Sequence, residues 1–221
     1  MKKIAVFDLD GTLAHTAPTL ALAMNIFLKE MGLSKIDAEL MKTFLGNGAR
    51  VLLKNVYEYL DLPREKKDID EALQRFFVCY EETYLEAELY EGIYETVKTL
   101  CENGVTVGVL SNKPHRFVPP LVKKFFPDLP IAFAVGQTER PRKPDPTVLL
   151  ELIKEAGSDA ENCIYIGDSD VDISTAKNAK VTSCVVSWGY RPIELLKEMH
   201  PDIIVDTANE LCEALITFAV K

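Results

Sequence analysis

Acidic residues cluster at two places in the sequence where they could bind a metal ion or attack phosphorus. Asp8 and Asp10 lie in the segment Asp-Leu-Asp-Gly-Thr, which ends at Thr12, and Asp168 and Asp172 lie in Gly-Asp-Ser-Asp-Val-Asp. Converging carboxylates repel one another unless a cation lies between them, and Mg²⁺ prefers such oxygen ligands. We therefore expect a Mg²⁺ site with a carboxylate that acts as a nucleophile toward a phosphoryl group, forming an aspartyl-phosphate.

Three further polar side chains could bind the phosphoryl group. Ser111 and Asn112 follow an apolar run, and Lys143 lies in the segment Arg-Pro-Arg-Lys-Pro-Asp-Pro. Phosphoryl transfer needs cations and hydrogen-bond donors to balance charge, for which Lys143, Ser111 and Thr12 are candidates. It also needs a group that protonates the leaving oxygen and later activates water. Asp-Leu-Asp-Gly-Thr after an apolar run is rarely a chance match, whereas Ser111-Asn112 alone fits a strand-end cap, Lys143 a solvated loop and the acids near Asp168 a helix N-cap. The specific signal is the conjunction of all four in this order, each after a strand.

Short apolar runs and helical patterns alternate along much of the chain. The runs are rich in β-branched residues and end at Gly, Pro or Asp, as buried parallel strands do; they span 4–7, 106–110, 131–135, 163–166, 183–186 and 203–205. Helical patterns cover 147–156, 173–179, 193–199 and 208–220. This alternation predicts an α/β fold, a Rossmann-like parallel sheet with helices on both faces. Ligands of such sheets bind at the carboxyl ends of the strands, where the polar clusters should meet.

One long region interrupts the alternation and predicts a second domain. We find no strand pattern between residues 16 and 90, where amphipathic helical patterns cover 19–31, 49–60 and 68–85. A structureless loop of this length is uncommon in a compact domain. We expect an α/β catalytic core domain of residues 1–15 and 91–221 and an inserted α-helical cap domain of residues 16–90.

Composition limits the partners of the protein. The chain has 221 residues, a net charge of −9 and 48% hydrophobic residues, as folded globular proteins do. Its acidity gives no general attraction to nucleic acid or anionic membranes, and no apolar run is long enough for a membrane helix. Five scattered cysteines favour a reducing, cytoplasmic setting. We expect a small phosphorylated metabolite as the partner, with no nucleic acid and no membrane, and a monomer or homodimer.

The motifs together resemble those of the haloacid dehalogenase-like hydrolases over essentially the whole chain. The resemblance rests on Asp8-Leu-Asp10-Gly-Thr12, Ser111, Lys143 and the segment from Gly167 to Asp172. The helical insert is similar to the small helical cap of one class of that superfamily. Four segments are most similar to phosphoglycolate phosphatase-like members: Leu-Gly-Asn-Gly at 45–48, Leu-Ser-Asn-Lys-Pro at 110–114, Lys-Pro-x-Pro at 143–146 and Trp-Gly-Tyr at 188–190.

The resemblance implies a role for each motif residue. It makes Asp8 the nucleophile and Asp10 the general acid and base, with the Asp10 backbone carbonyl also a ligand of Mg²⁺. It makes Asp168 a direct metal ligand beside Asp8, with Asp172 supporting the metal site. Ser111 and Lys143 bind the phosphoryl group, and Lys143 also steadies Asp8. The implied activity is Mg²⁺-dependent hydrolysis of a small phosphate monoester, similar to phosphoglycolate, through an aspartyl-phosphate.

Two departures from the family pattern stand outside the motifs. The family often has Asp-Ser at the entrance to the cap, where this chain has His15-Thr16. The helix after the last motif commonly ends in Ala-Gly, where this chain has Ala179-Lys180. If position 180 needs a left-handed backbone, a lysine there costs about 1 kcal/mol or more. We expect neither departure to affect the chemistry.

The substrate has to be selected by the insert. Gly46 and Gly48 precede a helix that contains Arg50, and backbone N–H groups at a helix N-terminus with an arginine beside them suit a small carboxylate. Alternatively, the glycines only form a turn and Arg50 is a solvated surface residue. A phosphomutase or other phosphotransferase acting on a sugar phosphate, or a pyrophosphatase, also fits this core. Asp10 and Asp168 argue against a dehalogenase, which uses neither a second acid nor a metal.

Overall fold

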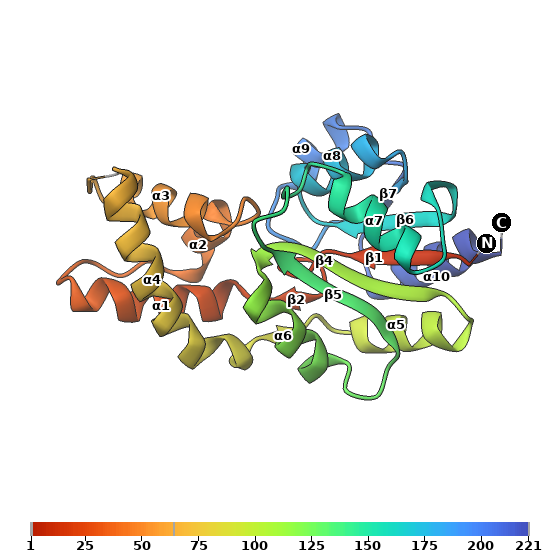
Figure 1. The fold of residues 1–221 in the computed structure, drawn as a ribbon, viewed down its shortest axis with the longest axis horizontal. Helices are drawn as coiled ribbons and strands as arrows, with labels where there is room; N and C mark the ends of the chain where they lie inside the picture. The colour runs from red at the N-terminus through yellow and green to blue at the C-terminus, as the bar shows by residue number, and fades with distance from the viewer. Residues whose placement is uncertain (1, 64, 221) are drawn as a thin grey trace.

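A parallel sheet forms the centre of the molecule in the computed structural model, which describes residues 2–63 and 65–220 (Figure 1). The strand order is β5-β4-β1-β6-β7-β8, and every neighbouring pair is parallel. The strands are β1 (Ile4–Phe7), β4 (Thr106–Pro114), β5 (Ile131–Gln137), β6 (Cys163–Gly167), β7 (Thr182–Val186) and β8 (Ile203–Val205). The order reverses direction around β1, so β1 lies at the switch point where ligands of such sheets bind.

Helices cover both faces of the sheet, as the sequence pattern predicts. The Ala5 and Phe7 side chains of β1 pack against one layer of helices, and Ile4 and Val6 pack against the other. The first layer contains α5 (Ile93–Glu102), α6 (Val118–Phe125) and α10 (Ala208–Ala219). The second contains α7 (Thr147–Glu155), α8 (Asp170–Ala179) and α9 (Ile193–Glu198). Because side chains alternate between the faces of a strand, β1 has to be apolar at every position.

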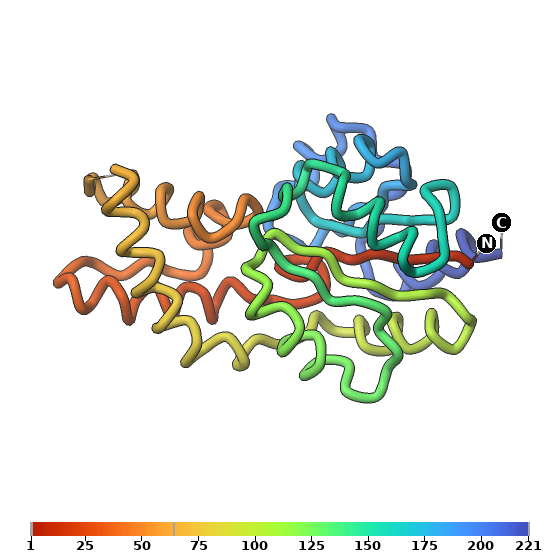
Figure 2. Tube along the Cα trace, viewed as in Figure 1, coloured from red at the N-terminus to blue at the C-terminus, as the bar shows by residue number. Residues whose placement is uncertain are grey.

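Four helices form a separate bundle beyond the end of the sheet. They are α1 (Ala17–Glu30), α2 (Ala38–Phe44), α3 (Ala49–Tyr59) and α4 (Lys66–Thr83), here called the helical bundle. Met24, Leu53 and Phe76 lie in its own apolar core, which also receives Phe117 and Tyr190 from the sheet side. Both chain termini lie at the opposite end of the molecule (Figure 2). The α2 helix has only seven residues, too few for its helical period to be clear in the sequence.

The chain enters and leaves the helical bundle through a small antiparallel ribbon. Its strands are β2 (Ala14–His15) and β3 (Glu88–Leu89), and the Tyr90 amide donates to the Leu13 carbonyl at 3.0 Å. The expectation of no strand between residues 16 and 90 is therefore wrong at its last few residues. Two-residue strands leave no alternation for sequence analysis to detect.

Most predicted elements are present, and the differences lie at their ends. The β4 strand continues past the predicted end at residue 110 to Pro114, which pairs with Gln137 of β5. Lys180, directly after α8, has a φ of 57°, so this position does need a left-handed backbone. The five cysteines are all free thiols. Within 2–63 and 65–220, we find no helix with the length and hydropathy that crossing a bilayer requires.

Candidate active site

Asp8 begins the loop that follows β1 and is held there by the sheet. Its amide donates to the Ile166 carbonyl of β6 at 2.8 Å, which extends the strand pairing by one residue. Its Oδ1 accepts the Leu9 amide at 2.7 Å, and its side chain is only 9% exposed. The carboxylate is therefore fixed by backbone that belongs to the sheet itself, as a group that must meet a reacting atom has to be.

The second pair of acids lies where β6 passes into α8. Ser169 caps the helix, and its hydroxyl, together with the Ser169 and Asp168 amides, donates to Asp172 Oδ2 at 2.5–3.2 Å. The capping box thus orients Asp172 with its other oxygen, Oδ1, turned toward Lys143.

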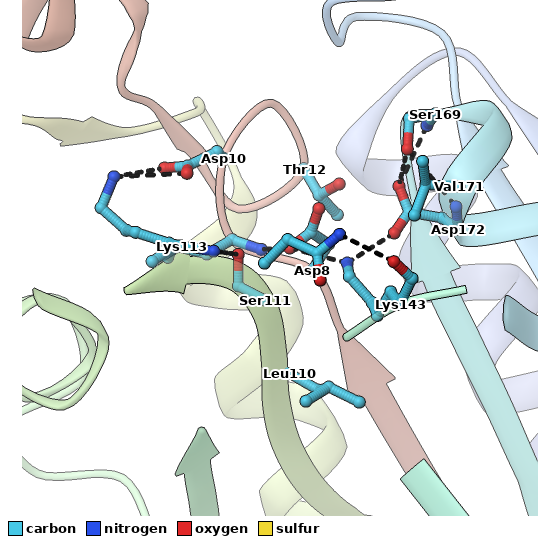
Figure 3. Close-up of polar contacts among 12 residues, drawn as sticks. Asp8, Asp10, Thr12, Leu110, Ser111, Lys113, Lys143, Ser169, Val171 and Asp172 are labelled. Carbon is cyan, nitrogen blue, oxygen red and sulfur yellow. Dashed lines mark hydrogen bonds and ion pairs between the residues drawn. The ribbon is translucent and has the colours of Figure 1, made fainter. Parts of the chain in front are cut away.

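Lys143 joins the two strand ends. Its ammonium donates to Asp172 Oδ1 at 2.7 Å and to the Tyr165 hydroxyl at 2.9 Å, and it lies 3.1 Å from Asp8 Oδ1 (Figure 3). Burial would lower the pKa of Lys143, but Asp172 and Asp8 outweigh it and hold the pKa well above its usual range. Lys143 is therefore charged, and all three of its protons are directed at fixed oxygens.

Asp168 lies in a space that only glycine neighbours allow. Its Oδ1 accepts the Thr12 hydroxyl at 3.0 Å and its Oδ2 accepts the Tyr190 amide at 2.8 Å. A Cβ on Gly11 would lie 2.4 Å from Asp168 Oδ2, and one on Gly189 would lie 2.1 Å from the Asp168 Cβ. Gly11 also has a φ of 85°, which side chains rarely tolerate. The two loops therefore close around this carboxylate at van der Waals distance.

Asp8, Asp168 and Asp172 form a group that fits a divalent cation. One oxygen from each lies within 4.8 Å of the others, and all three residues are buried. Burial raises the pKa of Asp8 to about 6, despite the nearby Lys143, and that of Asp168 to about 8, with further repulsion from neighbouring carboxylates. An all-oxygen donor set suits a hard cation such as Mg²⁺ or Ca²⁺. Asp172 accepts four hydrogen bonds at its two oxygens, whereas Asp168 accepts one at each oxygen, so Asp168 is the less saturated of the two.

The Asp10 carboxylate is not part of this group. Its Oδ1 accepts the Thr16 hydroxyl at 2.7 Å, and both of its oxygens accept the Lys113 ammonium at 3.0 and 3.2 Å. In Figure 3, Asp10 and Lys113 lie on the opposite side of Asp8 from Asp172. Four acids were expected at the metal, and the Asp10 side chain is the one that points away from it. The expected metal donor of Asp10 was its backbone carbonyl, which this contact does not affect.

The residues of the His15-Thr16 departure lie next to the site, and whether they affect the chemistry stays a prediction. Thr16 donates directly to Asp10, and the Thr16 and Ala17 amides both donate to the Tyr190 hydroxyl, at 2.8 and 2.9 Å. His15 lies 3.3 Å from the Tyr90 hydroxyl through its Nδ1. The reason is the ribbon geometry, since β2 ends where the loop of Asp10 folds back.

The predicted phosphoryl-binding residues on β4 line the same cavity as Asp8, but they already make hydrogen bonds within the protein. Ser111 is buried, lines the cavity and accepts the Lys113 amide at 3.3 Å. The Asn112 side-chain amide donates to the Lys143 carbonyl at 3.1 Å and to the Gly46 carbonyl at 3.2 Å. Asn112 therefore connects the loop of Lys143 to the helical bundle, and its amide protons are used in doing so.

Of the residues predicted to bind a substrate carboxylate, the two glycines lie at the cavity and the arginine does not. Gly46 and Gly48 line the cavity between the bundle and the sheet. Arg50 does not line it: Arg50 forms an ion pair with Asp70 of α4, and both side chains are more than 40% exposed. The expected placement of Arg50 is therefore wrong. Arg50 is the second residue of α3, two positions after Gly48, and its side chain is directed toward Asp70 of α4.

Sequence reasoning missed four residues that line this cavity: Tyr80, Lys113, Tyr190 and Arg191. Lys113 and Tyr190 belong to segments that the family resemblance quoted, but no chemistry was assigned to them. Arg191 donates to the Leu45 carbonyl at 2.5 Å and the Lys42 carbonyl at 3.3 Å. Tyr80 lies in an amphipathic helix, and no sequence signal separates it from an ordinary core residue.

Comparison with known proteins agrees with this arrangement of strand-end acids. The model of the family described as "Haloacid dehalogenase-like hydrolase" matches residues 5–186, a span that contains every acid of the site. The chain belongs to the haloacid dehalogenase-like hydrolases. Within the matched span, Asp8 and Asp168 follow two neighbouring strands and Lys143 lies in the loop after β5.

Relatives within the haloacid dehalogenase-like hydrolases match almost the full chain. A phosphoglycolate phosphatase of Agrobacterium fabrum is 35% identical over 97% of this chain and 93% of its own length. Phosphoglycolate phosphatase 1 of Pseudomonas aeruginosa is 32% identical over 96% of this chain and 79% of its own length. A crystal structure from Lactobacillus delbrueckii subsp. bulgaricus superposes with a TM-score of 0.90 at 32% identity, covering 97% of this chain and 99% of that one.

Proposed function

We propose that this protein is a Mg²⁺-dependent phosphatase that hydrolyses a small, phosphoglycolate-like phosphate monoester through an aspartyl-phosphate on Asp8. The observation that carries the proposal is the position of the Asp8 carboxylate, which is buried, 3.1 Å from the Lys143 ammonium and grouped with Asp168 and Asp172 in a set of oxygens that fits a cation. Relatives named phosphoglycolate phosphatases support the substrate class.

The proposed reaction uses Asp8 and Asp10 in turn. The Asp8 carboxylate attacks phosphorus, an aspartyl-phosphate bond forms, and the bond from phosphorus to the ester oxygen breaks. The leaving oxygen takes a proton from Asp10. Water then attacks the phosphorus and gives a proton to Asp10, which releases inorganic phosphate and restores the Asp8 carboxylate. Thr16 and Lys113 hold the Asp10 carboxyl in place between these steps.

Lys143 and a cation held by the carboxylates would offset the negative charge of the phosphoryl group. The Asp8 and Asp168 carboxylates would hold Mg²⁺, with the Asp10 backbone carbonyl as a further oxygen donor. When bound, Mg²⁺ supplies positive charge that offsets the phosphoryl oxygens. The Ser111 hydroxyl would bind those oxygens from the protein side. The Lys143 ammonium would exchange its contact with Asp8 for one with a phosphoryl oxygen, and Asp172 keeps Lys143 oriented through the contact at 2.7 Å.

We propose that the chain divides as the sequence predicts, with 1–15 and 91–221 as the catalytic core and 16–90 as the cap. Support comes from the separate apolar core of the helical bundle and from the cavity between bundle and sheet. A cap over Asp8 excludes bulk water from the aspartyl-phosphate. The free cysteines support a reducing, cytoplasmic setting.

A hydrolysis screen of small phosphate esters, with Mg²⁺ and with excess chelator, tests the proposed function. We expect phosphate release from small esters with Mg²⁺ and loss of turnover in chelator. Conversion of a sugar phosphate to its isomer without release of phosphate would show a phosphomutase instead. Full activity in chelator would contradict the metal dependence.

A further inference from the structure

A buried lysine faces the part of the cavity that lies farther from Lys143. Among the described residues that line this cavity, the cations are Lys113 and Arg191. The Lys113 side chain is only 2% exposed, and its ammonium contacts both oxygens of Asp10. The ion pair with Asp10 holds this ammonium in a place shielded from solvent.

The other cations near the cavity are engaged elsewhere. Lys143 directs its protons at Asp8, Asp172 and Tyr165, on the far side of Asp8 from Lys113 (Figure 3). Arg191 donates hydrogen bonds to the Leu45 and Lys42 carbonyls, which belong to the helical bundle. Arg50 points to Asp70 on the exposed surface. Lys113 contacts Asp10, the residue proposed to protonate the ester oxygen. It is therefore the buried cation nearest to the part of the substrate on the other side of that oxygen from phosphorus.

A hydroxyl without a partner lies next to this lysine. Tyr80 of α4 is 1% exposed and lines the same cavity, and its hydroxyl makes no hydrogen bond of normal geometry with the described residues. The Lys113 ammonium lies 4.7 Å from the centre of the Tyr80 ring. A buried hydroxyl left unpaired costs free energy, so such groups commonly mark the place of a ligand or water.

The remaining wall on this side is apolar, which limits what can bind there. Leu20, Leu52, Phe76 and Phe77 line it. These side chains offer no donors to the hydroxyls of a sugar. A short anionic group needs only the ammonium and one hydroxyl.

We infer that Lys113, together with the Tyr80 hydroxyl, binds an anionic group at the non-phosphoryl end of the substrate and thereby selects phosphorylated hydroxy acids. The inference rests on the proposed function and assigns its specificity to β4 and α4 rather than to Arg50. An ammonium has three protons, so Lys113 can hold Asp10 and a substrate carboxylate together. The two buried lysines then bind opposite ends of the substrate: Lys143 the phosphoryl group and Lys113 the carboxylate.

The test compares two esters that differ by one charge. Phosphoglycolate carries a carboxylate where its amide, phosphoglycolamide, carries a neutral group of the same size. We expect Lys113→Met to lower kcat/KM for phosphoglycolate about tenfold to a hundredfold more than for the amide, as the loss of a charge-assisted hydrogen bond would. Tyr80→Phe keeps the ring and should give a smaller loss of the same selectivity, which tests the site even if Lys113→Met does not fold. Lys54→Met, at an exposed lysine of α3, is the matched control and should leave kcat/KM unchanged for both esters.

Glycolate inhibition gives a second readout that does not depend on turnover. We expect glycolate to inhibit the wild type more strongly than glycolamide does, and Tyr80→Phe to reduce that difference. Equal losses for both esters in both variants would overturn the inference and leave Lys113 as a residue that positions Asp10. If the wild type hydrolyses neither ester nor any other in the screen, the proposed function fails and the inference fails with it.

Discussion

The pKa of Asp8 is set by the groups that surround it. Burial raises its pKa to about 6, even though the Lys143 ammonium opposes this effect. Asp172 lies behind Lys143, so the charge next to Asp8 is held in place by a second acid that faces away from the cavity. The proposed nucleophile therefore depends on Asp172, a residue that does not line the cavity.

Asp8→Asn should abolish turnover and leave the fold intact. The amide has nearly the volume of the carboxylate and can keep the 2.7 Å contact with the Leu9 amide, but it cannot attack phosphorus. We expect kcat to fall about a thousandfold or more, as when other covalent nucleophiles are removed. Steady-state kinetics and thermal unfolding of the same preparation check this. Activity within tenfold of the wild type would contradict the assignment of Asp8.

The effect of Mg²⁺ on stability should increase with pH. Folding raises the pKa of Asp8 to about 6 and that of Asp168 to about 8. In the metal-free protein, their contribution to stability is therefore complete below the ordinary aspartate value and is lost as pH rises toward 8. A bound cation removes this loss, whereas protons displace the cation at low pH. Thermal unfolding with and without Mg²⁺ should show a larger rise in Tm at about pH 8 than at about pH 5.5; an equal rise at both would contradict this.

Arg50→Ala should change kcat/KM less than about twofold for any ester, because exposed ion pairs contribute little. Its partner Asp70 and its exposed position place it outside the cavity. The measurement is the same pair of esters used for Lys113. A selective tenfold loss with phosphoglycolate would restore the original interpretation of Arg50.

The acids of this site were predictable because they follow strands, and the residues of the helical bundle were not. A parallel sheet brings all of its carboxyl ends to one edge, so Asp8, Lys143 and Asp168 could be grouped from sequence order alone. The direction of a side chain on a helix depends on packing with other helices, which is why Arg50 was misplaced and Tyr80 was missed.

At the scale of single elements, sequence and structure differ where tertiary contacts override local preference. The residues from Ser111 to Pro114 are polar and end in proline, and alone they favour a loop. They are strand because β5 continues beside them as far as Gln137. The α5 and α6 helices were not predicted, although each has an apolar face in the core. Only the α2 helix was too short to detect.

Lys180→Gly should stabilise the protein. Lys180 follows α8 with a φ of 57°, a conformation in which a side chain costs about 1–2 kcal/mol. The greater freedom of glycine in the unfolded chain offsets part of this gain, so we expect about 1 kcal/mol and a rise in Tm of about 2–4 °C. Differential scanning calorimetry measures this, with kcat as a control that should not change. An unchanged or lower Tm would show that the lysine side chain makes a compensating interaction.

At the scale of the whole molecule, one set of contacts between the helical bundle and the sheet side runs through the carbonyl groups of a single loop of the bundle. Arg191 binds the Leu45 carbonyl, Asn112 binds the Gly46 carbonyl and Arg142 binds the Asn47 carbonyl at 3.0 Å. All three donors lie on the sheet side, close to the residues of the site. The position of the bundle over Asp8 is therefore set by the same segments that carry the chemistry.

Gly48→Ala should disturb this contact more than it disturbs the fold. A Cβ on Gly48 would lie 2.7 Å from Gln137 Oε1 and 3.3 Å from the Asn112 carbonyl. We expect kcat/KM to fall about tenfold or more, because small misplacements of substrate-positioning groups are costly. Gly157→Ala is the matched control: its φ of 78° is similar to that of Gly48, 82°, but nothing lies within 4 Å of its Cβ. Equal activity losses in both variants would trace the effect to backbone strain alone.

The ribbon of β2 and β3 has a consequence for how the chain folds. The β1 strand has to find β4, whose paired residues Ile4 and Thr106 lie about 100 positions apart. Once the ribbon has formed, its strands hold residues 15 and 88 together, and the loop that remains to be closed is only about 30 residues long. Loop-closure entropy varies with the logarithm of length, so an early ribbon lowers the cost of forming the central strand pair by about 1 kcal/mol. The insertion thus separates β1 from the other five strands of the sheet along the chain, and the ribbon transfers most of the closure entropy to the folding of the helical bundle.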